Sequence, residues 1–148
     1  MEKRFLCTVF SLLLLLFTSC DEKEDKNNDI LTDTKWRLTE TVNKNTNQTT
    51  TPQREGDTYY TLSFGSKDHF TGVSAAREFS GTFQVFSNQS AISLTVHNQT
   101  GGDTTYGDDQ SYVDRLKEMN RFTYTTSSLV MESDHYTLKF KRIYPENN

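Results

Sequence analysis

The segment Phe79-Ser80-Gly81-Thr82-Phe83-Gln84-Val85 carries the clearest structural signal in this 148-residue chain. A period of two places Phe79, Phe83 and Val85 on one face of a β-strand. Gly81 lies within the same strand, where it predicts a bend or a close approach of a neighbouring backbone. The segment therefore predicts a sheet strand with one face in a core.

The same alternation recurs on both sides of this segment. Trp36, Leu38 and Val42 mark a first strand from Thr34 onward. A second strand is predicted over residues 58–64, with Tyr60, Leu62 and Phe64 on one face, and residues 65–68 read as a hairpin turn into 69–72. Further strands are predicted around Ile92, Leu94 and Val96, and over residues 122–125, 129–132 and 136–140.

Residues 108–119 break the period of two. Tyr112, Leu116 and Met119 are spaced by four and three, which is the spacing of one face of an α-helix, and Asp108 or Asp109 could cap its start. The predicted fold class is therefore α+β: a mainly antiparallel β-sheet, curled toward a small barrel, with one packed α-helix.

Two segments read as loops by composition. Residues 43–56 are rich in Asn, Thr and Gln, and residues 98–107 contain Gly101-Gly102. Loops of this kind often hold binding sites.

The composition limits the classes of partner. The chain has 16 basic and 20 acidic residues, a formal charge of −4, and no basic surface of the kind that binds nucleic acid. Only 33% of its residues are hydrophobic, but 10 Phe and 7 Tyr bury enough area for a modest core.

The N-terminus is typical of a bacterial lipoprotein signal peptide. Lys3 and Arg4 precede an apolar run over residues 5–17, and the small residues Thr18 and Ser19 precede Cys20. We expect cleavage after residue 19, lipidation of Cys20 and attachment to a membrane through the lipid. The predicted location is the cell envelope, as an outer-membrane lipoprotein on either the periplasmic or the surface-exposed face.

Residues 20–33 follow as a charged tether, and residues 34–148 form the predicted domain. Residues 21–29 contain no apolar side chain, which favours a flexible linker. Their acidic cluster also resembles the export signals of surface-exposed Bacteroidetes lipoproteins, and a plain solvated spacer is the alternative.

Several motifs in order resemble the META domain of HslJ-like lipoproteins, over most of residues 35–143. The resemblance implies a compact antiparallel sheet with a packed helix, an envelope role linked to stress or surface properties, and no established catalytic residues. The motifs that carry it are Thr34-Lys35-Trp36-Arg37-Leu38, Thr61-Leu62-Ser63-Phe64, Thr71-Gly72-Val73-Ser74, Phe79-Ser80-Gly81-Thr82-Phe83 and Leu138-Lys139-Phe140.

The chain departs from that family at two cysteines. The family usually carries a Cys-Asn pair and a later cysteine, and these positions correspond here to Ala76, Arg77 and Thr104. Within the resemblance, this departure implies that a covalent pair was lost and that no redox role remains.

Candidate chemical groups are few. His69, His97 and His135 lack a second histidine at ligand spacing, so they predict no metal site. Asp103, Asp108 and Asp109 could bind calcium, but they lack the spacing of an EF-hand, and capping explains the latter two. No nucleophile motif or phosphate loop is present in the sequence. We therefore expect no enzyme activity and no cofactor, and an interaction loop containing Arg77, Glu78, Asp103 and Thr104.

Three functions follow as hypotheses. The first is a non-enzymatic META-like envelope lipoprotein with a stress-related or binding role, acting on an envelope protein. The second is a secreted staphostatin-like inhibitor that presents a long loop to a cysteine protease. The third is a small-molecule or lipid binder at a barrel mouth. This last function requires that the interior is not filled by Phe83, Leu94, Tyr136 and Phe140.

Overall fold

The computed structural model describes residues 28–86, 88 and 90–145. The predicted signal peptide, Cys20 and residues 20–27 of the tether lie outside the described residues. No helix in the described part of the chain is long and apolar enough to cross a membrane. The elements in chain order are η1 Asn28–Ile30, β1 Thr34–Asn43, β2 Gln48–Thr50, β3 Thr61–Phe64, β4 His69–Val73, β5 Arg77–Phe86, β6 Ala91–Gly101, α1 Asp109–Glu118, β7 Arg121–Tyr124, β8 Ser128–Glu132 and β9 Tyr136–Ile143.

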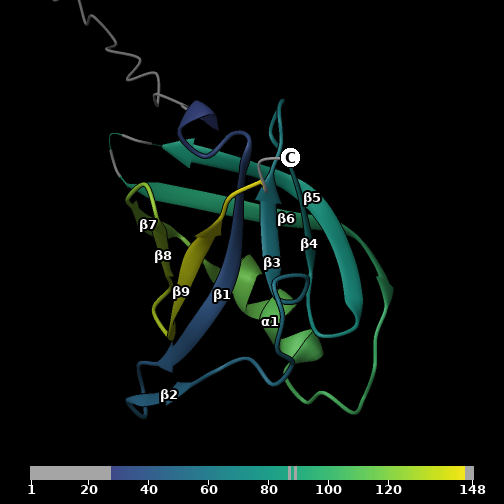
Figure 1. Ribbon diagram of the computed structural model, residues 1–148. Helices are drawn as coiled ribbons and strands as arrows, with labels where there is room; N and C mark the ends of the chain where they lie inside the picture. Colours follow the sequence, from purple (N-terminus) through teal and green to yellow (C-terminus); the bar gives the residue numbers. More distant parts are fainter. Residues whose placement is uncertain (1–27, 87, 89, 146–148) are drawn as a thin grey trace, which may run out of the picture.

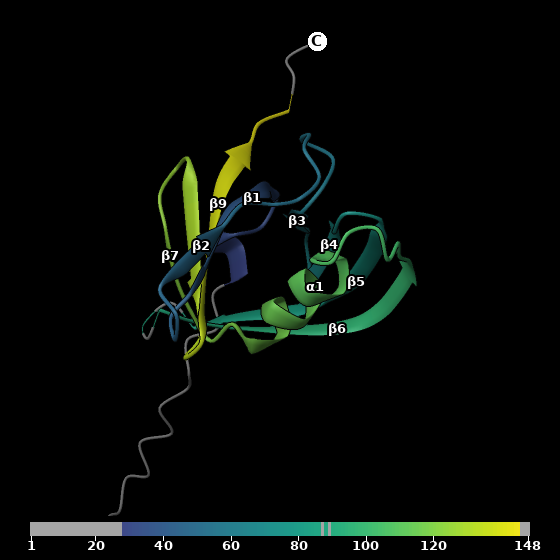
Figure 2. The same cartoon turned by 90° about the horizontal axis from the view of Figure 1, so that it is seen from below.

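The strands form one antiparallel sheet whose pairings return to their starting point. The order is β2-β1-β3-β4-β5-β6-β7-β8-β9, and β9 also pairs with β1 (Figure 1). Seen from below, α1 lies across the end of this ring, close to β6 (Figure 2). The predicted α+β class, a mainly antiparallel sheet with one packed helix, is therefore confirmed.

Strand β5 behaves as its alternation predicts. Phe79, Phe83 and Val85 are all buried. The register with β6 shifts between Ser80 and Gly81, and a Cβ on Gly81 would lie 1.9 Å from the carbonyl oxygen of Thr95. The predicted close backbone approach at Gly81 is confirmed.

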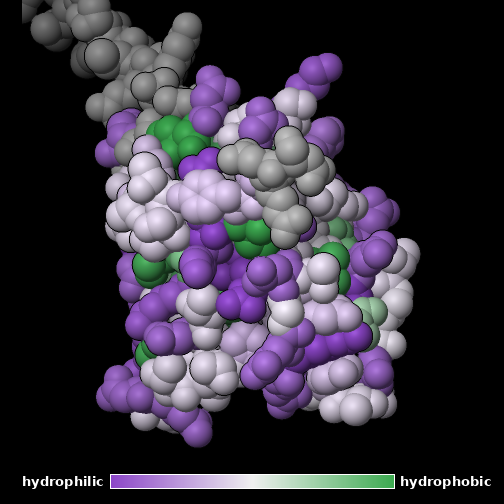
Figure 3. Space-filling model, viewed as in Figure 1, coloured by the Kyte–Doolittle hydropathy of each residue, from purple (hydrophilic) through white to green (hydrophobic). Residues whose placement is uncertain are grey.

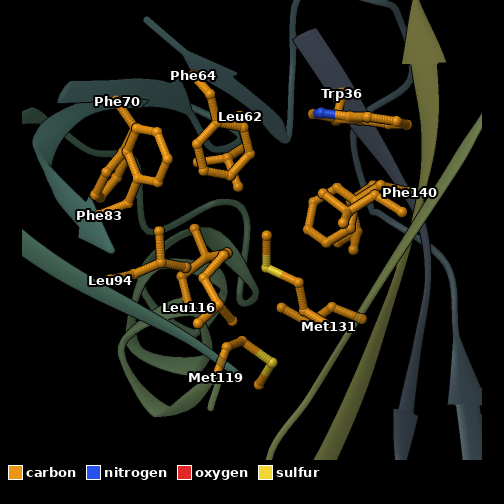
Figure 4. Packing of buried hydrophobic residues seen from close by; sticks show 14 of the residues in the cluster. Trp36, Leu62, Phe64, Phe70, Phe83, Leu94, Leu116, Met119, Met131 and Phe140 are labelled. Atoms are coloured by element: carbon orange, nitrogen blue, oxygen red, sulfur yellow. The ribbon is translucent and has the colours of Figure 1, made fainter. Parts of the chain in front are cut away.

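Buried aromatic and aliphatic side chains fill the interior (Figure 4). Phe64 and Phe83 pack edge to face with ring centroids 4.7 Å apart, and the Trp36 indole N–H donates to Thr34 Oγ1 over 2.7 Å. Leu94 and Phe140 are buried in the same cluster, and Tyr136 is half-buried against it. A ligand inside the ring would have to displace these side chains.

The second predicted strand begins later than its pattern indicates. Residues 58–64 alternate, but β3 starts only at Thr61. Tyr60 has a φ of +51°, which lies outside the β region, so the extended backbone cannot continue back through Tyr59 and Thr58. Tyr60, Leu62 and Phe64 are nevertheless all buried, as predicted.

The inward face of β1 shifts along the strand. Trp36 and Leu38 are buried as predicted, but Thr41 is buried in place of Val42, which is half-buried. The pairing with β9 has a register shift between Leu38 and Glu40, and one extra residue there exchanges the two faces.

The two predicted loops are partly strand. Residues 43–56 contain β2, which pairs with residues 41–43 of β1 around a turn at Asn47, whose φ is +55°. Residues 98–107 begin with the end of β6, which continues to Gly101. Polar composition indicated loops at both places, but hydrogen bonds to a neighbouring strand stabilise extended backbone there.

The packed part of the chain begins before the predicted boundary at Thr34. Leu31 is fully buried. The Asn28 side chain accepts a hydrogen bond from Val85 N at 2.7 Å and donates to the Asp68 carboxylate and to Phe83 O. These contacts fix η1 on the end of β5, so residues 28–33 belong to the folded domain.

Candidate functional site

A buried carboxylate organises the loops at one end of the ring. Asp109, in the first turn of α1, is 3% exposed. It accepts hydrogen bonds from Ser74 Oγ, from Ala76 N at 2.8 Å and from Asp103 N at 3.4 Å. The Arg77 Nε atom lies 3.5 Å from its second oxygen.

The environment of Asp109 favours its charged form. Burial by itself would raise the pKa of the carboxyl, but the hydrogen bonds from Ser74, Ala76 and Asp103 and the Arg77 charge together lower it. Asp108 occupies the N-cap position of α1, as expected, but its side chain makes no capping hydrogen bond. Both carboxylates instead bind groups on neighbouring segments.

Asp108 holds the segment that leads into β3. It accepts from the Tyr60 hydroxyl at 2.6 Å and from Gln53 N at 3.0 Å. Burial raises the pKa of Tyr60 far above its usual value, and the adjacent Asp108 carboxylate raises it further. The Tyr60 hydroxyl and the Asp108 carboxylate satisfy each other's hydrogen bonds, so we assign this pair a structural role.

Arg54 ties the same segment to two other loops. Its guanidinium lies 3.7 Å from the ring centroid of Tyr59 and 5.4 Å from that of Tyr106. Its Nη1 atom also donates to Ala75 O at 2.5 Å. Tyr59 is half-buried beneath Arg54 and packs against the core.

The histidines lie apart. His69 and His135 are exposed, and His97 Nε2 lies 3.0 Å from Thr82 Oγ1. Across residues 28–86, 88 and 90–145, no three His, Cys, Asp or Glu side chains form a group that could hold a metal ion.

The residues of the predicted interaction loop separate into two places. Arg77 and Asp103 meet at Asp109, and Thr104 is exposed in the adjacent turn. Glu78 instead lines a groove on the outer side of the sheet.

This outer groove crosses five strands. The register aligns the outward residues Lys35, Ser63, Thr71, Ser80 and Asn98 in one row across β1, β3, β4, β5 and β6. The groove encloses about 420 Å³. Strands are spaced by about 4.8 Å, so the row spans roughly 19 Å. Figure 3 shows the side of the molecule drawn toward the viewer in Figure 1, where most of the surface is hydrophilic and hydrophobic residues form small separate spots.

The polar side chains of the groove have unused hydrogen-bonding capacity. Within the described part of the chain, none has a side-chain hydrogen bond or ion pair, in contrast to the buried network around Asp109; they are Lys35, Ser63, Thr71, Glu78, Ser80, Asn98, Gln99 and Thr100. Hydroxyls and amides both donate and accept, so they fit a ligand rich in hydroxyl or amide groups.

The charges in the groove balance. Lys35 is its cation and Glu78 its anion, which favours an uncharged or zwitterionic ligand over an ionic one. Its lining contains neither histidine nor cysteine. The arrangement suits binding.

Sequence reasoning missed the residues of this groove, apart from Glu78. The sequence signal for the groove is the set of polar residues that alternate with the apolar ones along each strand and so point outward. Ser63, Thr71 and Ser80 belong to this set. Their alignment depends on the register between strands, which a single sequence does not contain.

No family model matches the chain, and no curated protein matches its sequence. Solved structures that resemble it include a DUF4847 family protein from Bacteroides vulgatus, with a TM-score of 0.60 and 11% identity over 82% of this chain and 99% of that chain. A protein from Burkholderia xenovorans has a TM-score of 0.63 and 16% identity over 80% of this chain and 87% of that chain. At these identities the likeness shows a shared fold and no more.

Proposed function

We propose that this protein is a lipid-anchored lipoprotein of the cell envelope that binds an uncharged, hydroxyl-rich ligand, such as a neutral glycan, in its outer groove. The observation that carries the proposal is the row of polar side chains without protein partners across five strands, in which four strands supply a hydroxyl or an amide and β1 supplies Lys35. A groove of about 420 Å³ is within the usual range for ligand sites.

The fold is proposed to be a small barrel of the META type. The return of the pairings from β9 to β1 supports a closed barrel. The position of Ala76 supports the META resemblance. Its carbonyl oxygen accepts a hydrogen bond from Gly102 N at 3.0 Å, and Gly102 is two residues before Thr104 in the sequence. The two positions that correspond to the family's cysteines thus belong to neighbouring segments.

Binding without catalysis is supported by the use of the acidic groups. Asp108 and Asp109 are engaged with Tyr60, Gln53, Ser74 and Ala76. Carboxylates bound in this way hold neighbouring segments together.

The anchor is supported by the sequence around Cys20. Mass spectrometry of the protein isolated from membranes should find an acylated N-terminal Cys20. An unmodified Cys20, or cleavage elsewhere, would contradict the anchor.

A glycan array tests the binding site. We expect the mature chain to retain neutral glycans above acidic ones, and the double variant Thr71→Leu and Ser80→Leu to lose this retention, because the two substitutions remove hydroxyls from the centre of the row. The matched control is Thr123→Leu, at an exposed position on β7. Retention of acidic glycans alone, or an equal loss in the control, would contradict the proposal.

A further inference from the structure

We infer that the outer groove takes a single-chain amphiphile, with an uncharged hydroxyl-rich head in the polar part and one alkyl chain in an adjoining apolar pocket. The inference rests on the proposed function and specifies its ligand class.

The apolar pocket adjoins the groove along the same row of residues. Ile143 on β9 pairs with Lys35, which in turn pairs with Ser63, so the row extends onto a sixth strand. A second pocket of about 400 Å³ lies there, and it shares Lys35 and Ser63 with the outer groove. The two pockets therefore meet at these two residues.

The lining changes character at this junction. Ile143, Tyr144 and Pro145 contribute apolar surface to the second pocket, whereas seven of the twelve residues that line the first carry a hydroxyl or amide side chain. Tyr144 is 58% exposed, and its hydroxyl donates to Thr126 O at 2.8 Å. This hydrogen bond holds an aromatic ring at the edge of the pocket, where an alkyl chain would remove it from water.

Lys35 suits the junction between head and chain. A lysine side chain places its methylene stem along apolar surface and keeps its ammonium group in polar surroundings. It therefore contacts the end of an alkyl chain and the first hydroxyls of a head group at once.

The charges argue for an uncharged head. Asp33 and Glu78 line the two pockets as anions, and Lys35 and Arg142 line them as cations, so the formal charges of the combined site cancel. A fatty acid or an anionic phospholipid would bring a charge that the site does not balance.

The apolar pocket also lies at the end of the domain nearest the proposed anchor. Asp33 and Thr34, at the start of β1, line it. The chain from Cys20 to Asn28 reaches at most about 29 Å when extended. An acylated Cys20 would thus keep this pocket close to the membrane from which an amphiphile would come.

The test uses the mature chain, residues 20–148 with Cys20→Ser, which contains every described element of the fold. Calorimetric titration compares n-octyl β-D-glucoside below its micelle concentration with n-hexyl β-D-glucoside, maltose and octanoate. We expect octyl glucoside to bind about tenfold more tightly than hexyl glucoside, because each buried CH₂ adds roughly 0.8 kcal/mol. Maltose should bind weakly and octanoate not at all.

One variant and its control test whether the alkyl chain of the ligand lies in the apolar pocket. Ile143→Ser should weaken octyl glucoside toward hexyl glucoside and leave maltose unchanged. The matched control Val130→Ser, also at a half-buried strand position, should change neither. Circular dichroism of both variants checks that they fold.

The outcomes separate the two proposals. Equal affinities for octyl and hexyl glucoside, with maltose still bound, would overturn the amphiphile and leave the glycan site standing. Octanoate bound as tightly as octyl glucoside would overturn the uncharged head. No binding of any probe would overturn both the inference and the proposed groove function.

Discussion

At Gly81, the absence of a side chain permits the pairing of β5 with β6. A Cβ at this position would lie 1.9 Å from Thr95 O and 3.0 Å from a ring carbon of Phe70. The first contact is with backbone, which cannot move without breaking the register on both sides of the shift. The register shift between Ser80 and Gly81 therefore depends on this glycine.

Gly81→Ala should therefore destabilise the protein by about 3 kcal/mol, at the upper end of the range for an overpacked core. The free energy of unfolding in urea measures this loss. Gly107→Ala is the matched control, because its nearest contact would be Gln53 Nε2 at 3.9 Å. Similar losses in the two variants would show that the close approach is not the cause.

Among the elements, α1 and β6 depend on each other. β6 meets β7 through one aligned pair, Ala91 with Arg121, although it pairs with β5 along its whole length. The helix packs beside β6 and buries Tyr112, Val113 and Leu116. At this part of the ring, side-chain packing takes the place of strand pairing.

Leu116→Ala should therefore loosen β6 more than the strands that pair on both sides. We expect a loss of about 3 kcal/mol, because Leu116 is fully buried, and faster amide hydrogen exchange in β6 than in β1 and β9. Lys117→Ala, at the adjacent exposed position, is the control. A uniform increase in exchange across all strands would contradict a local role for the helix.

The elements also show what a single sequence reveals. Alternation found the inward faces of β5 and β6, and the spacing of Tyr112, Leu116 and Met119 found the helix, because these patterns follow from local geometry. These local patterns did not reveal the positive φ of Tyr60, which depends on contacts with distant segments. Composition concealed β2, whose residues are all exposed and gain their order from pairing with β1.

The candidate site was less predictable than the fold. Glu78 was singled out among exposed residues, but its neighbours in the groove come from five strands, and their register is a tertiary property. Arg77 and Asp103 were singled out as well, but the structure uses both to hold Asp109. A polar side chain does not show from sequence whether its partner lies inside the protein or outside it.

For the whole molecule, carboxyl groups with a lowered pKa link stability to pH; among the described residues they are Asp103, Asp109, Asp114 and Glu132. Asp109 has a lowered pKa, because its hydrogen bonds and Arg77 outweigh the effect of burial. The pKa of Glu132 is lowered by a hydrogen bond from Lys44 and by the charge of that lysine, against the opposing effect of burial. In both cases the folded protein binds the proton less tightly than the unfolded chain does.

The free energy of unfolding should therefore be highest above the ordinary carboxyl pKa values of 3.8 and 4.5, and should fall as the pH drops through the lower values of the folded state. Urea unfolding between pH 7 and pH 2 measures the slope. Asp109→Asn should be less stable at pH 7, because an amide N–H would face the Arg77 and Asp103 donors, and its slope should be flatter. Asp134→Asn, on an exposed side chain, controls for the loss of one carboxylate. An unchanged slope in Asp109→Asn would contradict the assignment.

The attachment of Asn28 to β5 has a mechanical consequence. A pull on the chain ahead of Asn28 meets its bonds to Val85, Phe83 and Asp68 and then the buried side chain of Leu31. Only after these yield does the load reach β1, which is paired with β3 and β9. Tension from the proposed membrane anchor would therefore have to break the contacts of η1 before it could act on the sheet.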